Sequence, residues 1–248
     1  MTFATEDDIP EGEVAEVAPG VVVERRSFLA AAALALAGVA LPGRAENPLP
    51  KSRAERWTLE EFLAAALPVA RELVRDTSVA GQDVYLLTLA SFAVRLGDVA
   101  LPEMKESGQG AGTTLGFHPS EPPIAVLHWK MSPGSSIRLH AHTYGNVCTI
   151  GLEGEARLRN FEMVGPRDFE AKGTIRIRCS NDQILGPGRT NLVSLERGYV
   201  HGFTAGPLGA RGLDLTTRIQ NKRPFPWLEV GDKPVDAARA IYEGRWVS

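Results

Sequence analysis

Histidine and cysteine are scarce in this sequence of 248 residues, which has five of the first and two of the second. Cys148 and Cys179 can form at most one disulfide, which excludes a disulfide-stapled scaffold, and we expect both to be free thiols. Two of the five histidines nevertheless stand one residue apart, within the segment GSSIRLHAHTYGNVCTIGLEG. A metal site would explain that pair, and so would an ordinary polar pair in a sheet.

A strong excess of charge of either sign is also missing. The chain has 27 Lys and Arg against 30 Asp and Glu, for a formal net charge of -3. This balance, with no basic stripe, argues against nucleic acid or an anionic membrane surface as the main partner. A composition of 44% hydrophobic and 23% charged residues is that of a globular protein with a buried core.

The most prominent apolar run, Phe28 to Leu41, is shorter than the roughly 20 residues that a spanning helix needs. Arg25 and Arg26 immediately precede it, and small residues up to Ala45 follow it. This arrangement resembles a twin-arginine export signal. The resemblance implies that residues 1–45 are removed, that the twin-arginine translocase is a partner during export, and that the mature protein is periplasmic or extracellular without a permanent membrane anchor. The alternative is a buried Ala/Leu helix that belongs to the domain.

Apolar residues at helical spacing predict an N-terminal helical segment over residues 46–105. One helix is predicted to start at Thr58, which forms a capping box with Glu61 three residues later. Pro68 predicts a kink in that helix, because proline removes a backbone hydrogen bond. A second amphipathic helix is predicted over residues 83–96.

Beyond the helices the pattern changes. Residues 106–123 are rich in Gly, Pro and Ser, which predicts a linker. Residues 124–222 contain short runs of alternating or β-branched residues, separated by turn signals such as Glu153-Gly154. Many short strands without intervening helices indicate a sandwich or barrel. The tail, residues 223–248, is predicted to add a short helix on the outside.

The paired histidines lie in one predicted strand. Because alternate side chains of a strand share a face, His140 and His142 point to the same side, about 7 Å apart along the backbone. His201 follows a strand and a Gly-containing turn, an arrangement that can return it beside the pair. Neutral imidazole suits Zn, Cu, Fe and Ni, and three ligands leave coordination positions open.

Two segments carry a family resemblance. PGSSIRLHAHTYGNVCTIGLEG resembles the first motif of the cupin superfamily, and PGRTNLVSLERGYVHGF resembles the second, over about half of the mature chain. The resemblance implies a mainly β fold, a cupin double-stranded β-helix (RmlC-like jelly roll) barrel, here preceded by short α-helices. It implies metal ligation by His140, His142 and His201, and a homodimer is common in this superfamily.

One departure from the cupin pattern refines the resemblance. Val147 stands where the superfamily usually has a glutamate ligand, and valine cannot bind metal. A three-histidine site resembles the thiol dioxygenases, the cysteine dioxygenase-like branch. The resemblance implies a Fe(II)-dependent dioxygenase whose substrates are a small thiol and O2. Zn, Ni, Mn and Cu remain alternatives to iron, since imidazole sites do not select one metal.

Four further residues are candidates for the site. If the strand is regular, Arg138 shares the face of His140, and it or Arg157 could bind a substrate carboxylate. Tyr144 and Tyr199 flank the ligands and could donate a hydrogen bond, Tyr144 as a catalytic group and Tyr199 as a substrate-binding one. The competing interpretation is exposed arginines at the barrel rim and ordinary packing of the tyrosines. Of the remaining histidines, we expect His128 to be structural and His118 to be solvated.

Other departures leave the chemistry open. Cys148 stands one residue after the position where some thiol dioxygenases carry a cross-linked cysteine, so no cross-link is expected. The outer-sphere serine, histidine and tyrosine of that branch fall near Gly212, Asp214 and Thr216, so that network is expected to be absent. The alternatives are another metal-dependent cupin enzyme (an isomerase, decarboxylase or hydrolase) or a non-catalytic periplasmic metal or small-ligand binding protein. Asn146 could add a ligand in the binding protein.

Overall fold

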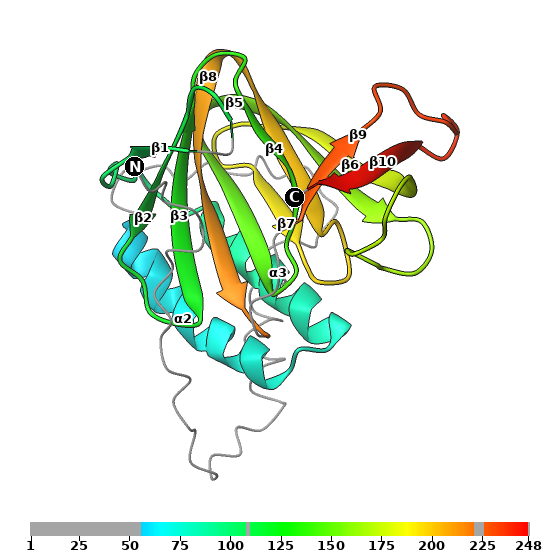
Figure 1. The fold of residues 1–248 in the computed structure, drawn as a ribbon. Coiled ribbons are helices and arrows are strands. Elements are labelled where there is room, and N and C mark those ends of the chain that lie inside the picture. Colours follow the sequence, from blue (N-terminus) through cyan, green and yellow to red (C-terminus); the bar gives the residue numbers. More distant parts are fainter. Residues whose placement is uncertain (1–55, 108–109, 221–225, 248) are drawn as a thin grey trace, which may run out of the picture.

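The structure is a computed structural model that describes residues 56–107, 110–220 and 226–247 (Figure 1). The predicted export signal, residues 1–45, lies outside the described residues. Of the helices described, none combines the length and the apolar character that a membrane span requires.

Two helices precede the strands: α2, Leu59–Arg75, and α3, Val79–Ala93. The predicted capping box is present, since the Thr58 hydroxyl accepts from the Glu61 backbone and the Glu61 carboxylate accepts from the Thr58 backbone. Helix α2 continues through Pro68 to Arg75.

Helix α3 begins earlier than the predicted residue 83. The Ser78 side chain caps it by accepting from the backbone N–H of Gly81. The prediction missed this turn because Gly81 interrupts the apolar pattern, although a serine cap needs no apolar residue after it.

The strands are β1 (Lys105–Glu106), β2 (Thr113–His118), β3 (Ile124–Met131), β4 (Ser136–Ala141), β5 (Gly145–Met163), β6 (Ile175–Leu185), β7 (Thr190–Val193), β8 (Val200–Arg218), β9 (Trp227–Val230) and β10 (Ile241–Val247). Strand β6 shows why such segments become strands. Its isoleucines at 175 and 177 are buried while the arginines that follow them are exposed, a period of two that covers one face only. The predicted fold class, a mainly β jelly-roll barrel preceded by short α-helices, is confirmed.

The long strands β5 and β8 belong to both layers of the barrel. The first part of β5 pairs with the second part of β8 beside β3 and β7, and the second part of β5 pairs with the first part of β8 beside β4 and β6. The register shifts near Gly154, which has a φ of 62°. The turn between two strands predicted at Glu153-Gly154 is therefore wrong: the chain bends there within one continuous pairing, and glycine permits the bend.

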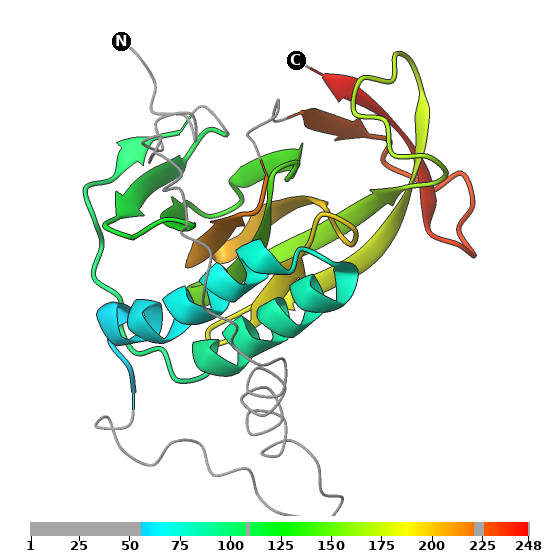
Figure 2. The ribbon, with the colours of Figure 1, turned by 90° about the horizontal axis from the view of Figure 1, so that it is seen from below.

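The helices cover one layer from outside (Figure 2). They bury apolar side chains against Cys148 and Ile150 of β5 and Leu213 and Leu215 of β8. Residues of the opposite parity point between the layers, where Trp129, Leu158 and Phe203 belong to one apolar cluster with Leu185. This alternation defines the barrel interior.

Two predicted segments differ from the structure. The predicted linker, 106–123, contains β2, whose six residues all pair with β3, because Leu115 and Phe117 complete the interior cluster. The predicted C-terminal helix is absent among residues 226–247, which form β9 and β10. Tyr242 and Trp246 alternate along β10 and pack on the outer face of the second layer, so burial overrides the helical propensity of the Ala-rich segment before them.

The C-terminal strands also close a ring. Strand β10 pairs with β6 and β9, and β9 contacts β4 through the pair His140 and Trp227. Because β8 also pairs with β5, these strands form a closed ring of neighbours on which Phe161, Ile177 and Val200 share one apolar cluster. His140 pairs with both β8 and β9 in this ring.

Candidate metal centre

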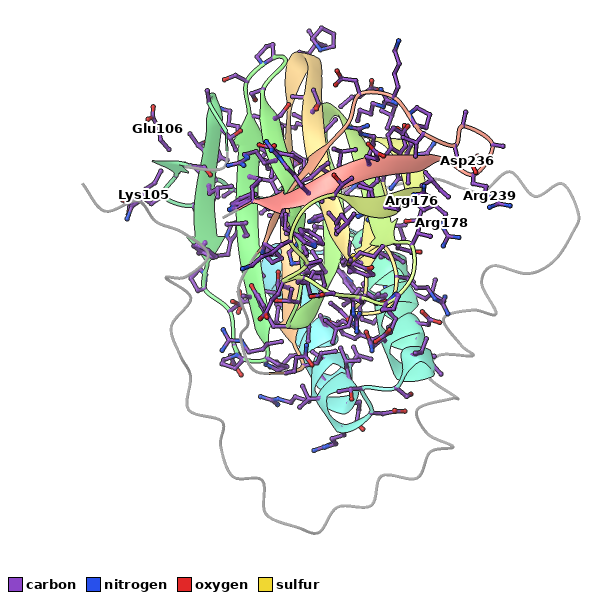
Figure 3. All side chains as sticks on the ribbon, turned by 45° about the vertical axis from the view of Figure 1, so that its right-hand side comes forward. Lys105, Glu106, Arg176, Arg178, Asp236 and Arg239 are labelled. Carbon is purple, nitrogen blue, oxygen red and sulfur yellow. The ribbon has the colours of Figure 1, made fainter. Side chains whose placement is uncertain are left out.

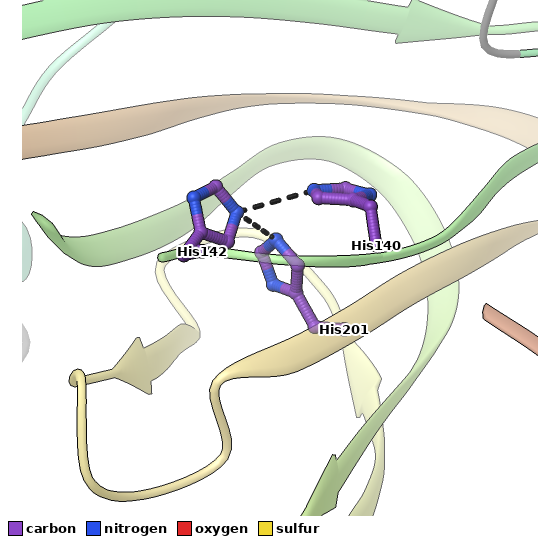
Figure 4. Close-up of side chains that lie close together, drawn as sticks. All are labelled: His140, His142 and His201. Carbon is purple, nitrogen blue, oxygen red and sulfur yellow. Dashed lines mark hydrogen bonds between the residues drawn. The ribbon is translucent and has the colours of Figure 1, made fainter. Parts of the chain in front are cut away.

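The structure brings His140, His142 and His201 together in the barrel interior (Figure 4). His140 lies on β4 and pairs with His201 on β8, and His142 follows β4 directly. A hydrogen bond from the backbone N–H of His142 to the carbonyl of Tyr199 (2.8 Å) joins the two motif segments. The three side chains are 0–2% exposed. Among the described residues, this is the only group of three or more potential protein ligands that the structure brings together.

The donor nitrogens are spaced for one ion. The Nε2 atoms of His140 and His142 lie 3.1 Å apart, and those of His142 and His201 lie 2.8 Å apart. Two nitrogens bound about 2.1 Å from one metal at about 84–110° would lie about 2.8–3.4 Å apart. A neutral His142 has at most one proton on Nε2, so it cannot donate to both neighbours. The residues therefore fit a shared cation better than they fit one another.

The imidazoles are in the neutral form that metals bind. Burial lowers the pKa of His140 to about 4, even though its hydrogen bond to a backbone carbonyl raises it. Burial and the neighbouring histidines lower the pKa of His142 and His201 well below the usual value. The Nδ1–H of His140 donates to the carbonyl oxygen of Arg138 (2.8 Å), which leaves its Nε2 lone pair directed at the cluster.

Val147 occupies the interior position at which the first cupin motif usually has a glutamate ligand. It is fully buried and pairs with Val193 and Thr216. Among the described residues no carboxylate joins the three histidines, so the donor set carries no charge of its own. Cys148 has the opposite orientation, as alternation predicts: it packs beneath the helices, and burial raises its pKa.

A row of amide side chains lines the interior beside the histidines, and sequence reasoning missed it. Asn181 on β6 donates both to Asn160 on β5 (3.2 Å) and to Asn191 on β7 (3.2 Å), and Gln183 donates to Asn191 (3.4 Å). We call Asn160, Asn181, Gln183 and Asn191 the amide row. The only sequence signal was their position at the inward-facing places of alternating strands.

The amide row also holds the turn that delivers His201. Asn160 is the register partner of His201, and its Nδ2 donates to the carbonyl of Gly198 (3.0 Å). The Gly198 backbone N–H donates to Glu162 (2.9 Å). With a φ of 58°, Gly198 suits this turn because a side chain there would crowd Asn160. The turn before β8 is thus fixed from both sides.

Arg138 is not on the face of His140. The register between β4 and β8 shifts between Ile137 and His140, so the alternation assumed for Arg138 fails. Its side chain is exposed, and its guanidinium carbon lies 5.0 Å from the ring centre of Trp227, whose ring lies 5.6 Å from that of His140. Arg138 contacts the three histidines through its backbone carbonyl oxygen, which accepts from His140, and not through its charged side chain.

The other three predicted residues lie in different surroundings. Arg157 is on the outer face of β5 and forms an exposed bidentate ion pair with Asp182. The Tyr199 hydroxyl accepts from the backbone N–H of Met163 (2.7 Å), and its ring belongs to the apolar cluster that contains Phe161 and Val200. Tyr144 is buried next to His142, and its carbonyl accepts from Ile219 and Gln220. The structure therefore brings neither Arg157 nor the Tyr199 hydroxyl to the histidines.

The remaining histidines form a separate pair. His118 Nε2 and His128 Nδ1 lie 3.0 Å apart across β2 and β3, and His128 is fully buried, as expected for a structural residue. His118, which we expected to be solvated, is half-buried, because the segment predicted as a linker is a strand. Both cysteines are free, as predicted. Asn146 shares the parity of Cys148, so it points away from the metal centre.

Comparisons with known proteins give only weak matches. No family model and no curated protein matches the sequence. Among solved structures, KdgF from Halomonas sp. is 14% identical, covers 49% of this chain and 89% of its own, and has a TM-score of 0.36. The polyketide cyclase RemF from Streptomyces resistomycificus is 19% identical, covers 53% of this chain and 82% of its own, and has a TM-score of 0.37. A cupin superfamily protein from Desulfitobacterium hafniense is 13% identical, covers 46% of this chain and 84% of its own, and has a TM-score of 0.32. Similarity this weak supports no conclusion, so the fold assignment rests on strand order and pairing.

Proposed function

We propose that this protein is a mononuclear Fe(II)-dependent dioxygenase acting on a small thiol. The observation that supports this most is the buried set of three neutral imidazoles with Val147 in place of a carboxylate. A neutral donor set leaves the full positive charge of a divalent ion available to an anionic ligand such as a thiolate. Iron bound there would supply open positions for the thiolate and O2.

In the proposed reaction, the residues of this chain hold the histidine ligands in place and exclude water from them. The carbonyl of Arg138 fixes the tautomer of His140, and the amide row fixes the turn that carries His201. The complete burial of the histidines keeps bulk water from competing with the thiolate.

The test is O2 uptake by the iron-loaded protein with cysteine, cysteamine and 3-mercaptopropionate. We expect thiol-dependent uptake with at least one of them, and a sulfinic acid as the product. His142→Ala should abolish uptake, whereas Arg157→Ala, on the outer face of the barrel, should preserve it. Absence of uptake with every thiol contradicts the proposal. Turnover that survives anaerobic replacement of iron by zinc would instead indicate Lewis-acid chemistry.

Export is a further part of the proposal, supported by the paired arginines and the apolar run near the N-terminus. The mature protein should begin near Glu46 and occur in the periplasmic or extracellular fraction. N-terminal sequencing of the mature form tests this, and replacement of Arg25 and Arg26 by lysine should retain the protein inside the cell. A mature chain that still starts at Met1 would contradict export.

A further inference from the structure

Helix α3 is apolar on its outward side as well as on the side that faces the barrel, so the prediction of an amphipathic helix is wrong. Asp83 is the only charged residue among its 15. Tyr85 and Leu89 are buried in the core beside the strands, but Leu87 and the C-cap residue Val94 on the other side are 54% and 64% exposed. Because a helix that is apolar all round is normally buried, these exposed side chains indicate that something covers α3.

The outward residues of α3 form one stripe. At about 100° per residue, side chains spaced by four and then three residues lie on one side of a helix. Leu87 is the middle of such a series, and none of its members is charged or buried. We call the series the α3 stripe: Ala80, Val84, Leu87, Ser91 and Val94. Among the described residues, no helix or strand lies over it (Figure 2).

Polar contacts fix which side of α3 faces the barrel. Gln82 Oε1 accepts from the backbone N–H of Leu195, in the turn before β8 (3.1 Å). The Tyr85 hydroxyl is hydrogen-bonded to the Thr217 hydroxyl on β8. Gln82 and Tyr85 are both buried. Because rotation of the helix would break these bonds, α3 cannot bury the stripe against its own barrel.

The labelled charged side chains lie away from the helices. Figure 3 shows Lys105 and Glu106 on β1, Arg176 and Arg178 on β6, and Asp236 and Arg239 before β10. A stripe without charge offers no electrostatic attraction to a nucleic acid or to an anionic lipid surface, because both are bound through cationic residues. What fits the α3 stripe is another uncharged, apolar helix face of similar length.

The α3 stripe is complementary to a second copy of itself. In an antiparallel pair around a two-fold axis at Leu87, the leucines of the two copies meet at the axis. Ala80 of each copy then meets Val94 of the other, and Val84 meets Ser91, so each larger side chain faces a smaller one. No like charges come together along the stripe, and the two helix dipoles point in opposite directions.

We infer that two copies of this chain form a dimer through their α3 stripes. The contact surface is a helix that precedes the barrel and lies outside it, so the inference does not depend on the metal or on the thiol chemistry. With a length of about 22 Å and a width of about 10 Å, α3 covers a small area. Stable interfaces bury roughly 1,200–2,000 Å² in total, so this dimer should be weak and should form reversibly as the concentration rises.

Analytical ultracentrifugation of the full chain over a range of concentrations tests the dimer. We expect wild type to shift from monomer to dimer as the concentration rises. Leu87→Glu and Leu87→Lys each bring like charges together at the axis and should raise the dissociation constant of the dimer at least 10-fold. An equimolar mixture of the two variants should dimerise again, because opposite charges then meet. Leu208→Glu is the matched control, since Leu208 is 90% exposed on β8 and its replacement should leave the dimer unchanged.

Val94→Glu is a second variant for the case in which replacement of Leu87 prevents folding, and circular dichroism checks that each protein is folded. It should also weaken the dimer, because Val94 lies at the end of the same contact. A wild type that stays monomeric at every concentration overturns the inference, and so does a dimer that Leu87→Glu and Val94→Glu leave intact. A monomer that binds vesicles of anionic lipid through Leu87 would assign the stripe to a membrane and would equally overturn it.

Discussion

At the scale of single residues, the proposed chemistry depends on the absence of a carboxylate at position 147. The pattern His-x-His and a downstream histidine supply the three ligands, and a buried valine in place of a carboxylate leaves that donor set neutral. A neutral donor set favours binding of an anion to the metal, and one carboxylate ligand would remove a unit of that charge.

Val147→Glu tests this directly. We expect the variant to retain about one metal ion per chain, because carboxylate adds a ligand. Thiol-dependent O2 uptake should fall at least 100-fold, since the thiolate loses both charge and a coordination position. Val147→Thr, of nearly the same volume, is the control and should retain most activity. A Val147→Glu protein that binds metal and turns over like wild type would refute the role of the neutral set.

Asp214 makes a separate prediction for stability. Burial raises the pKa of Asp214 to about 7, and side-chain hydrogen bonds from Thr149 and Trp129 act in the opposite direction. The ordinary pKa in the unfolded chain is about 3.9. Between these values the folded state holds a proton that the unfolded state has released. The contribution of Asp214 is therefore fully present below about pH 4 and is lost as the pH rises through about 7.

Asp214→Asn should remove this dependence, because asparagine resembles the protonated acid. In metal-free protein, the free energy of unfolding of wild type should fall relative to that of the variant as the pH rises from about 4 to about 8. The expected relative loss is up to about 4 kcal/mol. The buried histidines contribute in the opposite direction in both proteins, so the difference isolates Asp214. Urea unfolding at a series of pH values measures it, and parallel curves would show that Asp214 does not titrate this way.

At the scale of elements, periodic patterns were predictable and tertiary bends were not. The capping box of Thr58 and the alternation of β6 are local, so the sequence alone reveals them. The sequence predicts a turn between two strands at Gly154, because only pairing with β8 on both sides of the bend shows that β5 is one continuous strand. The bulge that turns Arg138 outward has no sequence signal either.

Gly154→Ala tests the bend. A Cβ at Gly154 would overlap the carbonyl oxygen of Gly209 on β8, and the φ of 62° is itself unfavourable for alanine. Gly165→Ala is a matched control, since Gly165 also has positive φ but open space around its Cβ position. We expect a loss of about 1 kcal/mol for Gly165→Ala and at least about 2 kcal/mol more for Gly154→Ala. Similar losses in denaturant unfolding would mean that the approach of the strands is not tight.

At the scale of the whole molecule, the metal centre connects distant parts of the chain. His140 and His142 come from the segment of β4, His201 from β8, and β9 contacts His140 from the C-terminal hairpin. The three-histidine set was predictable because its motifs carry it. The amide row was not, since its members become neighbours only when β5, β6 and β7 pair.

Metal binding should therefore stabilise the whole fold. A ligand present at 1,000 times its dissociation constant adds about 4 kcal/mol to the free energy of unfolding. We expect chelation to lower the Tm of wild type by several degrees and to leave that of His201→Ala unchanged. Thermal unfolding with and without chelator measures both, and an equal response of the two proteins would place the metal elsewhere.

The most direct test of the metal centre is the metal content of the purified protein, measured for wild type and for His142→Ala in parallel. We expect about one iron per wild-type chain and almost none in the variant, with circular dichroism showing that the variant is folded. Metal that persists in folded His142→Ala, or a wild type that takes up no metal when supplied with Fe(II), would contradict ligation by His140, His142 and His201.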